Sequence, residues 1–111
     1  MKMDFNLTSS IEGEVLVLTT EGYINNDGGQ RIVEEFNKHY EGGISKVLID
    51  IKDSKVVNSI GISYLIEIIE KLNEKSGTLY FCNMDAAIEK TFTIMGLFQF
   101  AKKVDSVSDI N

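Results

Sequence analysis

The amino-acid sequence predicts an α/β fold, a mixed β-sheet of four to five strands in which helices form the crossovers. Two observations support this class. The chain opens with two strand-like segments, and after residue 25 amphipathic helical segments alternate with short apolar runs. The expected order is strand, strand, helix, strand, helix, strand, helix, strand, with parallel strands in the centre. No linker or repeat divides residues 1–111, which we therefore interpret as one domain.

The first two strands are expected to form a hairpin. Residues 5–11 alternate in polarity, Glu12 and Gly13 provide a turn, and residues 14–20 form a β-branched run. A helix is expected next, over residues 25–40. Its apolar side chains recur at helical spacing, its candidate N-caps are residues 25–27, and two glycines stop it. The apolar positions are Ile32, Val33, Phe36 and Tyr40, and the stop is Gly42 and Gly43.

The middle of the chain contains the clearest alternation of strand and helix. Residues 46–51 form a continuous apolar run interrupted by Asp50, which is typical of a central strand covered on both faces. From residue 59 to residue 75, apolar side chains return every three or four residues, as in an amphipathic helix. Glu67 and Lys71 are spaced to form a supportive pair on this helix.

The last elements are shorter. Residues 78–83 read as another buried strand, Asp85 is expected to cap a helix that ends near Ile94, and residues 96–104 turn into a short final strand. Residues 105–111 begin like a helix. Met95 and Phe98 are expected in the core, with an exposed apolar edge as the alternative.

Composition excludes several functional classes. The formal net charge of -6 opposes direct binding to nucleic acid, and no segment has the length of a signal peptide or membrane span. Cys82, the single cysteine, lies in an apolar run, which indicates a buried thiol in a reducing compartment. We therefore expect a cytoplasmic protein that is not inserted in a membrane.

The most informative segment is residues 58–61, Asn-Ser-Ile-Gly, at the start of the longest predicted helix. Ser59 or Asn58 is suited to cap the free amides there, and Gly61 lets the backbone and any visiting chain come close without a side-chain clash. Because the carboxyl ends of parallel strands meet at one edge of a sheet, this turn should lie beside the turn at residues 22–27.

These residues resemble the STAS domain family, and the anti-sigma-factor antagonists within it. The family carries a strand followed by a DSSG turn and an apolar helix, which correspond here to VLIDI, NSIG and the helix from residue 59. The segments EGYIN and TIMGLFQFAKKVDSVSDI are similar to the family's upstream turn and its ending. The resemblance extends over nearly the whole chain.

The resemblance implies a function in partner switching. In antagonists of this kind, an anti-sigma-factor kinase uses ATP to phosphorylate the serine that corresponds to Ser59. The unphosphorylated form binds the anti-sigma factor, and phosphorylation abolishes that binding. The resemblance therefore implies an anti-sigma factor/serine-protein kinase as the partner, with a weak homodimer as a further option. The implied contact residues are Asn25, Asn26, Asn58, Ser59, Ile60, Gly61 and Ser63.

Three positions depart from the family pattern. Asn58 and Asn25 replace aspartates, and Ile60 replaces the second serine of the motif. Asparagine caps a helix as well as aspartate does, but it offers no carboxylate to a kinase, a metal or a basic surface. The alternative hypothesis is therefore an unmodified STAS module that assembles into a stress-signalling scaffold or serves a lipid-transport complex.

Other chemistries lack their required residues. Catalysis by Ser59 needs a base, and His39, the only histidine, belongs to a different predicted helix, where we expect it to be solvated. The sequence contains no phosphate-binding glycine loop, and His39 has no second ligand at metal spacing. A phosphoacceptor receiver domain would use aspartates after a buried strand, such as Asp50 and Asp53. Receiver domains begin with a strand followed by a helix, however, whereas this chain is expected to begin with two strands. We expect no enzyme activity and no cofactor.

Overall fold

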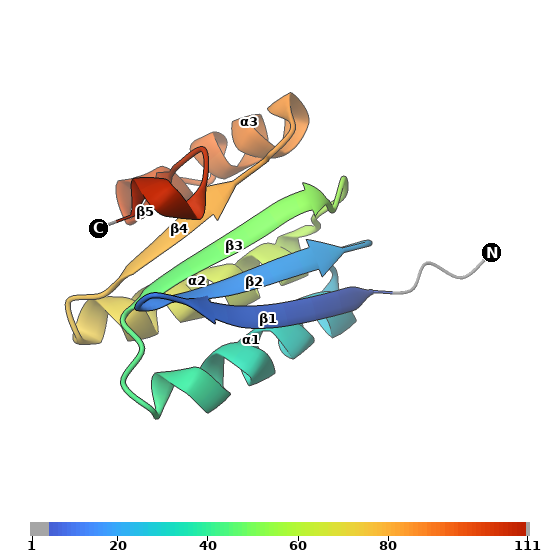
Figure 1. Cartoon of the computed structure of the whole chain (residues 1–111). Coiled ribbons are helices and arrows are strands. Elements are labelled where there is room, and N and C mark those ends of the chain that lie inside the picture. Colours follow the sequence, from blue (N-terminus) through green and yellow to red (C-terminus); the bar gives the residue numbers. More distant parts are fainter. Residues whose placement is uncertain (1–4, 111) are drawn as a thin grey trace.

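The computed structural model describes residues 5–110 and contains a five-stranded sheet in the order β1-β2-β3-β4-β5. Strand β1 is antiparallel to β2, and the other neighbouring strands are parallel (Figure 1). The predicted order of strands and helices is confirmed. The elements are β1 (Asn6–Glu12), β2 (Val15–Glu21), α1 (Asn26–Tyr40), β3 (Lys46–Asp53), α2 (Ser59–Glu74), β4 (Thr78–Cys82), α3 (Ala86–Ile94), the 3-10 turn η1 (Leu97–Gln99), β5 (Ala101–Lys103) and the 3-10 turn η2 (Val107–Asp109).

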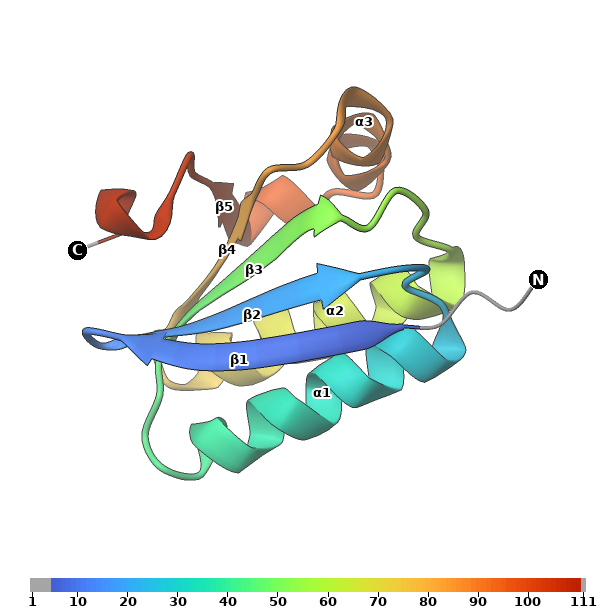
Figure 2. The ribbon, with the colours of Figure 1, turned by 45° about the vertical axis from the view of Figure 1, so that its right-hand side comes forward.

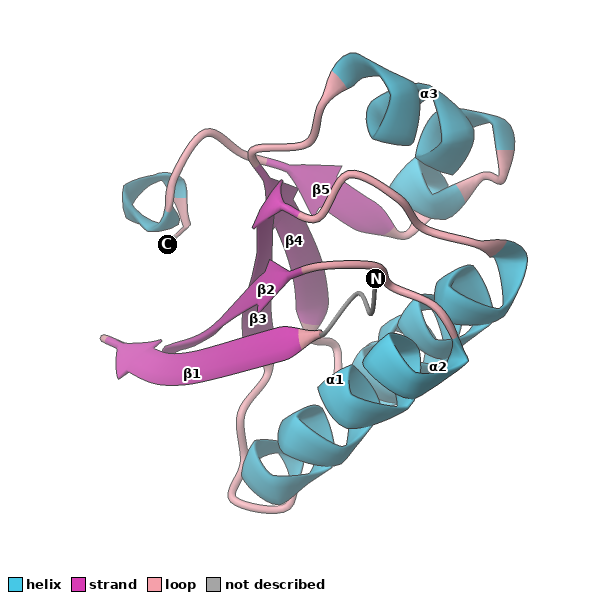
Figure 3. Cartoon of the chain, turned by 90° about the vertical axis from the view of Figure 1, so that its right-hand side faces the viewer, coloured by secondary structure: helices cyan, strands magenta, loops and turns pink. Residues whose placement is uncertain are grey.

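All three helices cover the same face of the sheet (Figures 2 and 3). Each of them connects two parallel strands that are neighbours in the sheet, and right-handed crossovers of that kind place their helices on one side. Alternate strand residues point toward the helices and form the main core with the helices' apolar faces. Fully buried members of this core include Leu16, Leu18, Ile32, Phe36, Ile49, Ile51, Leu65, Ile68, Phe81 and Phe92.

The hairpin is formed as predicted, with Gly13 at its turn. Its φ of 64° is a left-handed conformation that glycine adopts without a side-chain clash. Strand β2 is buried over Val15 to Leu18, whereas β1 is largely polar and exposed, as suits the edge of a sheet.

The face of the sheet opposite the helices is covered in part by the C-terminal segment (Figure 3). Side chains of Val104, Val107 and Ile110 pack over a second cluster of buried residues, Val15, Val17, Leu48 and Cys82. The predicted burial of Cys82 is confirmed. Burial, with a smaller effect of the Asp50 carboxylate, raises the pKa of its thiol to about 11. The helix expected from residue 105 is limited to η2, and residue 111 lies outside the described residues.

The prediction that Met95 belongs to the core is wrong, because 49% of Met95 is exposed. Helix α3 ends at Ile94, and Gly96 takes a left-handed φ of 80°, so the chain turns sharply after Met95. Phe98 is partly buried and contacts the rings of Phe81 and Phe92, at centroid distances of 6.5 and 6.4 Å. The apolar edge therefore includes Met95, while Phe98 packs on the core.

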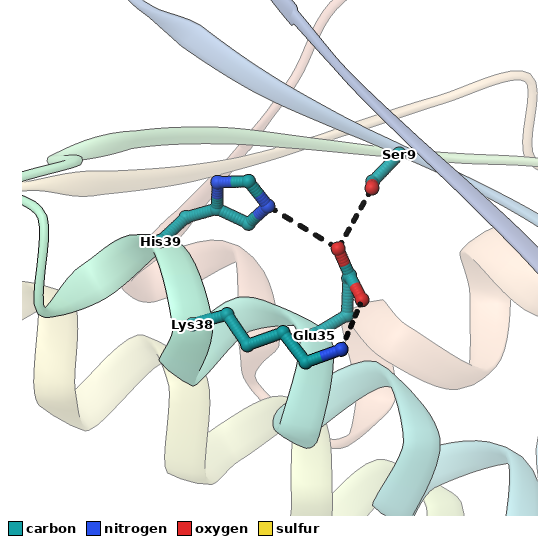
Figure 4. A network of polar contacts seen from close by, with 4 residues as sticks. All are labelled: Ser9, Glu35, Lys38 and His39. Atoms are coloured by element: carbon teal, nitrogen blue, oxygen red, sulfur yellow. Dashed lines mark hydrogen bonds and ion pairs between the residues drawn. The ribbon is translucent and has the colours of Figure 1, made fainter.

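Polar side chains join β1 to α1. Glu35 Oε2 accepts a hydrogen bond from Ser9 Oγ at 2.8 Å and lies 3.2 Å from His39 Nε2, and Lys38 Nζ lies 3.3 Å from the other carboxylate oxygen (Figure 4). These partners lower the pKa of Glu35, the Ser9 hydrogen bond most strongly. His39 is thus a partner of Glu35, and the expectation that it is simply solvated is corrected.

A second polar pair differs from the prediction. Lys71, which was expected to pair with Glu67, instead donates from Nζ to Asn37 Oδ1 on α1 at 2.9 Å. Helices α1 and α2 pack side by side, so a partner on the neighbouring helix is within reach of Lys71 (Figure 2).

Candidate functional site

The turns that follow β2 and β3 lie side by side at one edge of the sheet. Ile24 and Val57 form an isolated parallel bridge, with hydrogen bonds of 3.0 Å from Ile24 N to Val56 O and 3.2 Å from Asn58 N to Ile24 O. A third bond, 3.0 Å from Gly22 N to Asp53 O, joins the bases of the turns. We call residues 22–27 and 53–63 together the rim. The expected placement of the two turns on one edge is therefore observed.

Asn25 and Asn58 have the same structural role in the rim. Asn25 Oδ1 accepts the Gly28 amide at 3.0 Å, and Asn58 Oδ1 accepts the Gly61 amide at 2.8 Å. Each asparagine therefore caps one helix, and both helices begin at the same edge (Figure 3). The free amides and dipoles of two helix starts make this edge favourable for negative charge.

Ser59 is the first residue of α2 and is exposed. It belongs to the first turn of the helix, whose backbone amides have no partner within the helix. Ser63, one turn later, is also exposed, but its Oγ donates to Ile60 O at 2.6 Å. The rim therefore presents two serines in different settings, one at the helix start and one bonded to the helix backbone.

Apolar side chains flank Ser59. Ile60 is 50% exposed and Val56 is 47% exposed, although both belong to large hydrophobic residue types. Asn26 is exposed as well, and its Oδ1 accepts a hydrogen bond from Tyr64 Oη at 2.9 Å, which ties the start of α1 to α2. A mixed apolar and polar surface of this kind is typical of protein contact sites.

Gly61 permits the close backbone approach expected of it. It is buried, and a Cβ placed on it would lie 2.2 Å from the carbonyl oxygen of Ile24. The close approach that glycine permits is therefore made by the chain's own backbone. Gly61 therefore shapes the rim from a buried position, and its role in partner contact stays a prediction.

Sequence reasoning missed a buried hydroxyl pair that joins the rim to β2. Thr20 Oγ1 and Ser54 Oγ lie 2.7 Å apart, and both residues are buried. This bond holds the end of β2 against the turn after β3. Neither residue is part of a motif, and only the position of Ser54 shortly after the strand predicted over residues 46–51 hints at such a role.

The described residues contain no group of three or more histidine, cysteine, aspartate or glutamate side chains able to hold a metal ion. Asp50, considered above for a receiver site, accepts hydrogen bonds from Lys52 N and Asn83 Nδ2, both at 3.1 Å. Within residues 5–110, no helix is both long enough and apolar enough to span a membrane.

The fold and the rim define a class: a small α/β domain whose helices cover one face of a mixed sheet and whose second helix starts with an exposed serine. The chain belongs to the STAS domain family, whose model matches residues 6–110. The resemblance seen in the sequence is thereby confirmed. A search of curated proteins gave no match.

Solved structures, anti-sigma factor antagonists among them, share this fold. An antagonist from Mycobacterium paratuberculosis has a TM-score of 0.81 at 16% identity, with 96% of this chain and 90% of that chain covered. RsbS of Moorella thermoacetica has a TM-score of 0.77 at 19% identity, covering 93% and 89%. The phosphorylated form of the Bacillus cell fate determinant SpoIIAA has a TM-score of 0.73 at 16% identity, covering 96% of each chain. At these identities the likeness is one of fold.

Proposed function

We propose that this domain is an anti-sigma-factor antagonist that binds an anti-sigma factor with serine kinase activity through the rim, and that phosphorylation of Ser59 ends the complex. The observation that carries the proposal is the exposed serine at the first position of α2, beside the Asn25 turn. A domain of this kind acts in the cytoplasm and performs no catalysis itself. That SpoIIAA, which shares the fold, is known in a phosphorylated form supports the proposal.

The rim is suited to accept a phosphate without unfolding. A phosphoserine adds about -1.5 to -2 charges, which the free amides and dipole at a helix start stabilise. A partner packed against the exposed side chains of Ile60 and Val56 has no such compensation, because it desolvates the new charge. Phosphorylation therefore acts on the interface and leaves the fold intact.

The test uses the purified domain, the kinase-type anti-sigma factor from the same organism, and labelled ATP. We expect label on the wild-type domain and its loss in Ser59→Ala. The matched control is Ser63→Ala, because Ser63 is an exposed serine one turn further along the same helix. Equal labelling of Ser59→Ala and wild type would contradict the assignment of the site, and absence of a complex with the kinase would contradict the assignment of the partner.

The asparagines at positions 25 and 58 favour a second candidate function, that of an unmodified STAS module in a larger assembly. Both rim carboxylates expected of the family are replaced by neutral caps, Asn25 and Asn58. In this alternative, the kinase does not phosphorylate the native domain. The variant Asn58→Asp preserves the helix cap and restores the carboxylate, so the kinase should phosphorylate the variant. Size measurement in cell extract by light scattering separates the candidates, since only the assembly module is expected in a large particle.

A further inference from the structure

A second surface lies away from Ser59, in a groove between the second half of α2 and the chain from Met95 to Phe100. The groove has a volume of about 310 Å³ and is lined by Ile66, Ile69, Glu70, Asn73, Met95, Gly96, Leu97 and Phe100. At a rise of about 1.5 Å per residue, its α2 residues lie about 10 to 21 Å along the helix from Ser59. The groove is therefore separate from the rim.

Large apolar side chains stand exposed along the groove. Met95 is 49% and Phe100 59% exposed, and the adjoining Ile94 is 72% exposed. Their position is imposed by the backbone, because Gly96 turns the chain in a left-handed conformation while Leu97 is buried in the core. Met95 and Phe100 line one groove together with Ile66 and Ile69 of α2, and an exposed apolar surface of this kind marks a contact site.

The groove is bordered by negative charge. Glu67, Glu70 and Glu74 follow one another at intervals of three and four residues, so they form a ridge along one side of α2. Lys71, in the same half of α2, and Lys75, its C-cap residue, both interact with residues of α1. Lys71 bonds to Asn37 on α1, and the Lys75 ammonium lies 4.2 Å from the centre of the Tyr40 ring. The acidic ridge is thus not neutralised by these two cations.

We propose that this groove binds a basic amphipathic helix of a partner protein, with apolar side chains seated over Leu97 and Phe100 and lysines or arginines against the acidic ridge. Helix-in-groove recognition uses apolar anchors spaced three and four residues apart, and it matches an apolar channel beside a charged helix. A second copy of this chain does not fit. A contact between two copies brings two acidic ridges to one interface and offers no basic ridge to pair with them.

The experiment uses the intact domain and two fluorescein-labelled helical peptides of about 16 residues. Both carry leucines at i, i+3, i+4 and i+7. One peptide has lysines beside the leucines, and the other has glutamates at the same positions. Fluorescence anisotropy measures binding, and amide shifts in a ¹H–¹⁵N spectrum locate it. We expect the basic peptide to bind at least about tenfold more tightly than the acidic one, with shifts at residues 66–73 and 95–100.

Variants separate the groove from other exposed residues. Phe100→Ser should weaken the basic peptide about tenfold, and Glu70→Lys should weaken it about threefold while reducing its salt dependence. Both side chains are exposed, so the variants should keep the wild-type spectrum. The matched control is Ile11→Ser, an exposed apolar residue on β1, and Ser59→Asp should also leave peptide binding unchanged. Equal binding of both peptides, shifts confined to the rim, or no binding would overturn the proposal.

Discussion

The carbonyl oxygen of Ile24 lies against Gly61 so closely that a side chain at position 61 would have no space: a Cβ there would be 2.2 Å from the oxygen. The same carbonyl accepts the hydrogen bond from Asn58 N. The backbone of the Asn25 turn therefore rests directly on the first turn of α2, and this contact sets how the two halves of the rim face a partner.

Gly61→Ala is predicted to destabilise the domain by about 1 to 3 kcal/mol, because the added methyl group must push α2 away from the backbone at Ile24. The loss is measured by urea unfolding. Gly42→Ala is the control, since its nearest atom would be an ordinary 3.4 Å from the new Cβ, and it should change the stability by less than about 0.5 kcal/mol. An unchanged midpoint for Gly61→Ala would refute the close contact.

Ser59→Asp is predicted to keep or raise the stability, by about 0.3 to 1 kcal/mol at low salt, because a carboxylate at the start of α2 interacts favourably with the helix dipole. The gain should shrink in 1 M NaCl. Ser63→Asp, one turn further along, should show little of this gain. Urea unfolding at both salt concentrations checks the prediction, which fails if Ser59→Asp unfolds more easily than wild type at low salt.

Glu35→Gln is predicted to lower the stability at pH 7 by up to about 1 kcal/mol. The pKa of Glu35 is lowered in the folded protein, so its contribution is complete above the ordinary value near 4.5 and is lost as the pH falls through the folded value. The difference between variant and wild type should therefore disappear in acid. Unfolding measured from pH 7 downward checks the sign.

The hydrogen bond from Ser9 gives a second test of the same network. Ser9→Ala removes the largest cause of the lowered pKa, so the carboxyl group of Glu35 should titrate at a higher pH in an NMR titration. Ser10→Ala is the matched control on the same strand. If both variants leave the Glu35 titration unchanged, the contact between β1 and α1 is not formed in solution.

Cys82 is predicted to react slowly with a thiol reagent such as DTNB in the folded protein. The thiolate is the reactive form, and burial holds the pKa of this thiol at about 11. The double variant Val107→Ser, Ile110→Ser loosens the segment over Cys82 and should speed the reaction at least about tenfold. Phe100→Ser is the control, because Phe100 is not part of that cluster. Fast labelling of the wild type would contradict the described packing.

The sequence predicted the order of the elements because each helix and strand carries its own periodicity and its own stop signal. Asp85 caps α3 as predicted, and Asn25 and Asn58, each one of the candidates for its helix, cap α1 and α2. The placement of Ser59 beside the Asn25 turn followed from the general rule for parallel strands. These conclusions required only the spacing of apolar and capping residues along the chain and the rule that the carboxyl ends of parallel strands meet at one edge.

Features that depend on contacts between distant segments were not predictable in this way. Periodicity does not show that Gly96 turns the chain and leaves Met95 exposed, or that Lys71 reaches Asn37 on another helix. The sequence also does not show whether the close neighbour of a motif glycine is a partner or the chain itself, and at Gly61 the structure places the Ile24 backbone there. The residue roles in binding and phosphorylation stay predictions.

The bridge between Ile24 and Val57 continues the hydrogen-bonding pattern of the sheet past the ends of β2 and β3. Loops tied in this way are already ordered before any complex forms, so docking there costs little additional conformational entropy. Such a surface acts as a rigid template. Its affinity can then be changed steeply by a single charge, because the loops have little freedom to rearrange and relieve the repulsion.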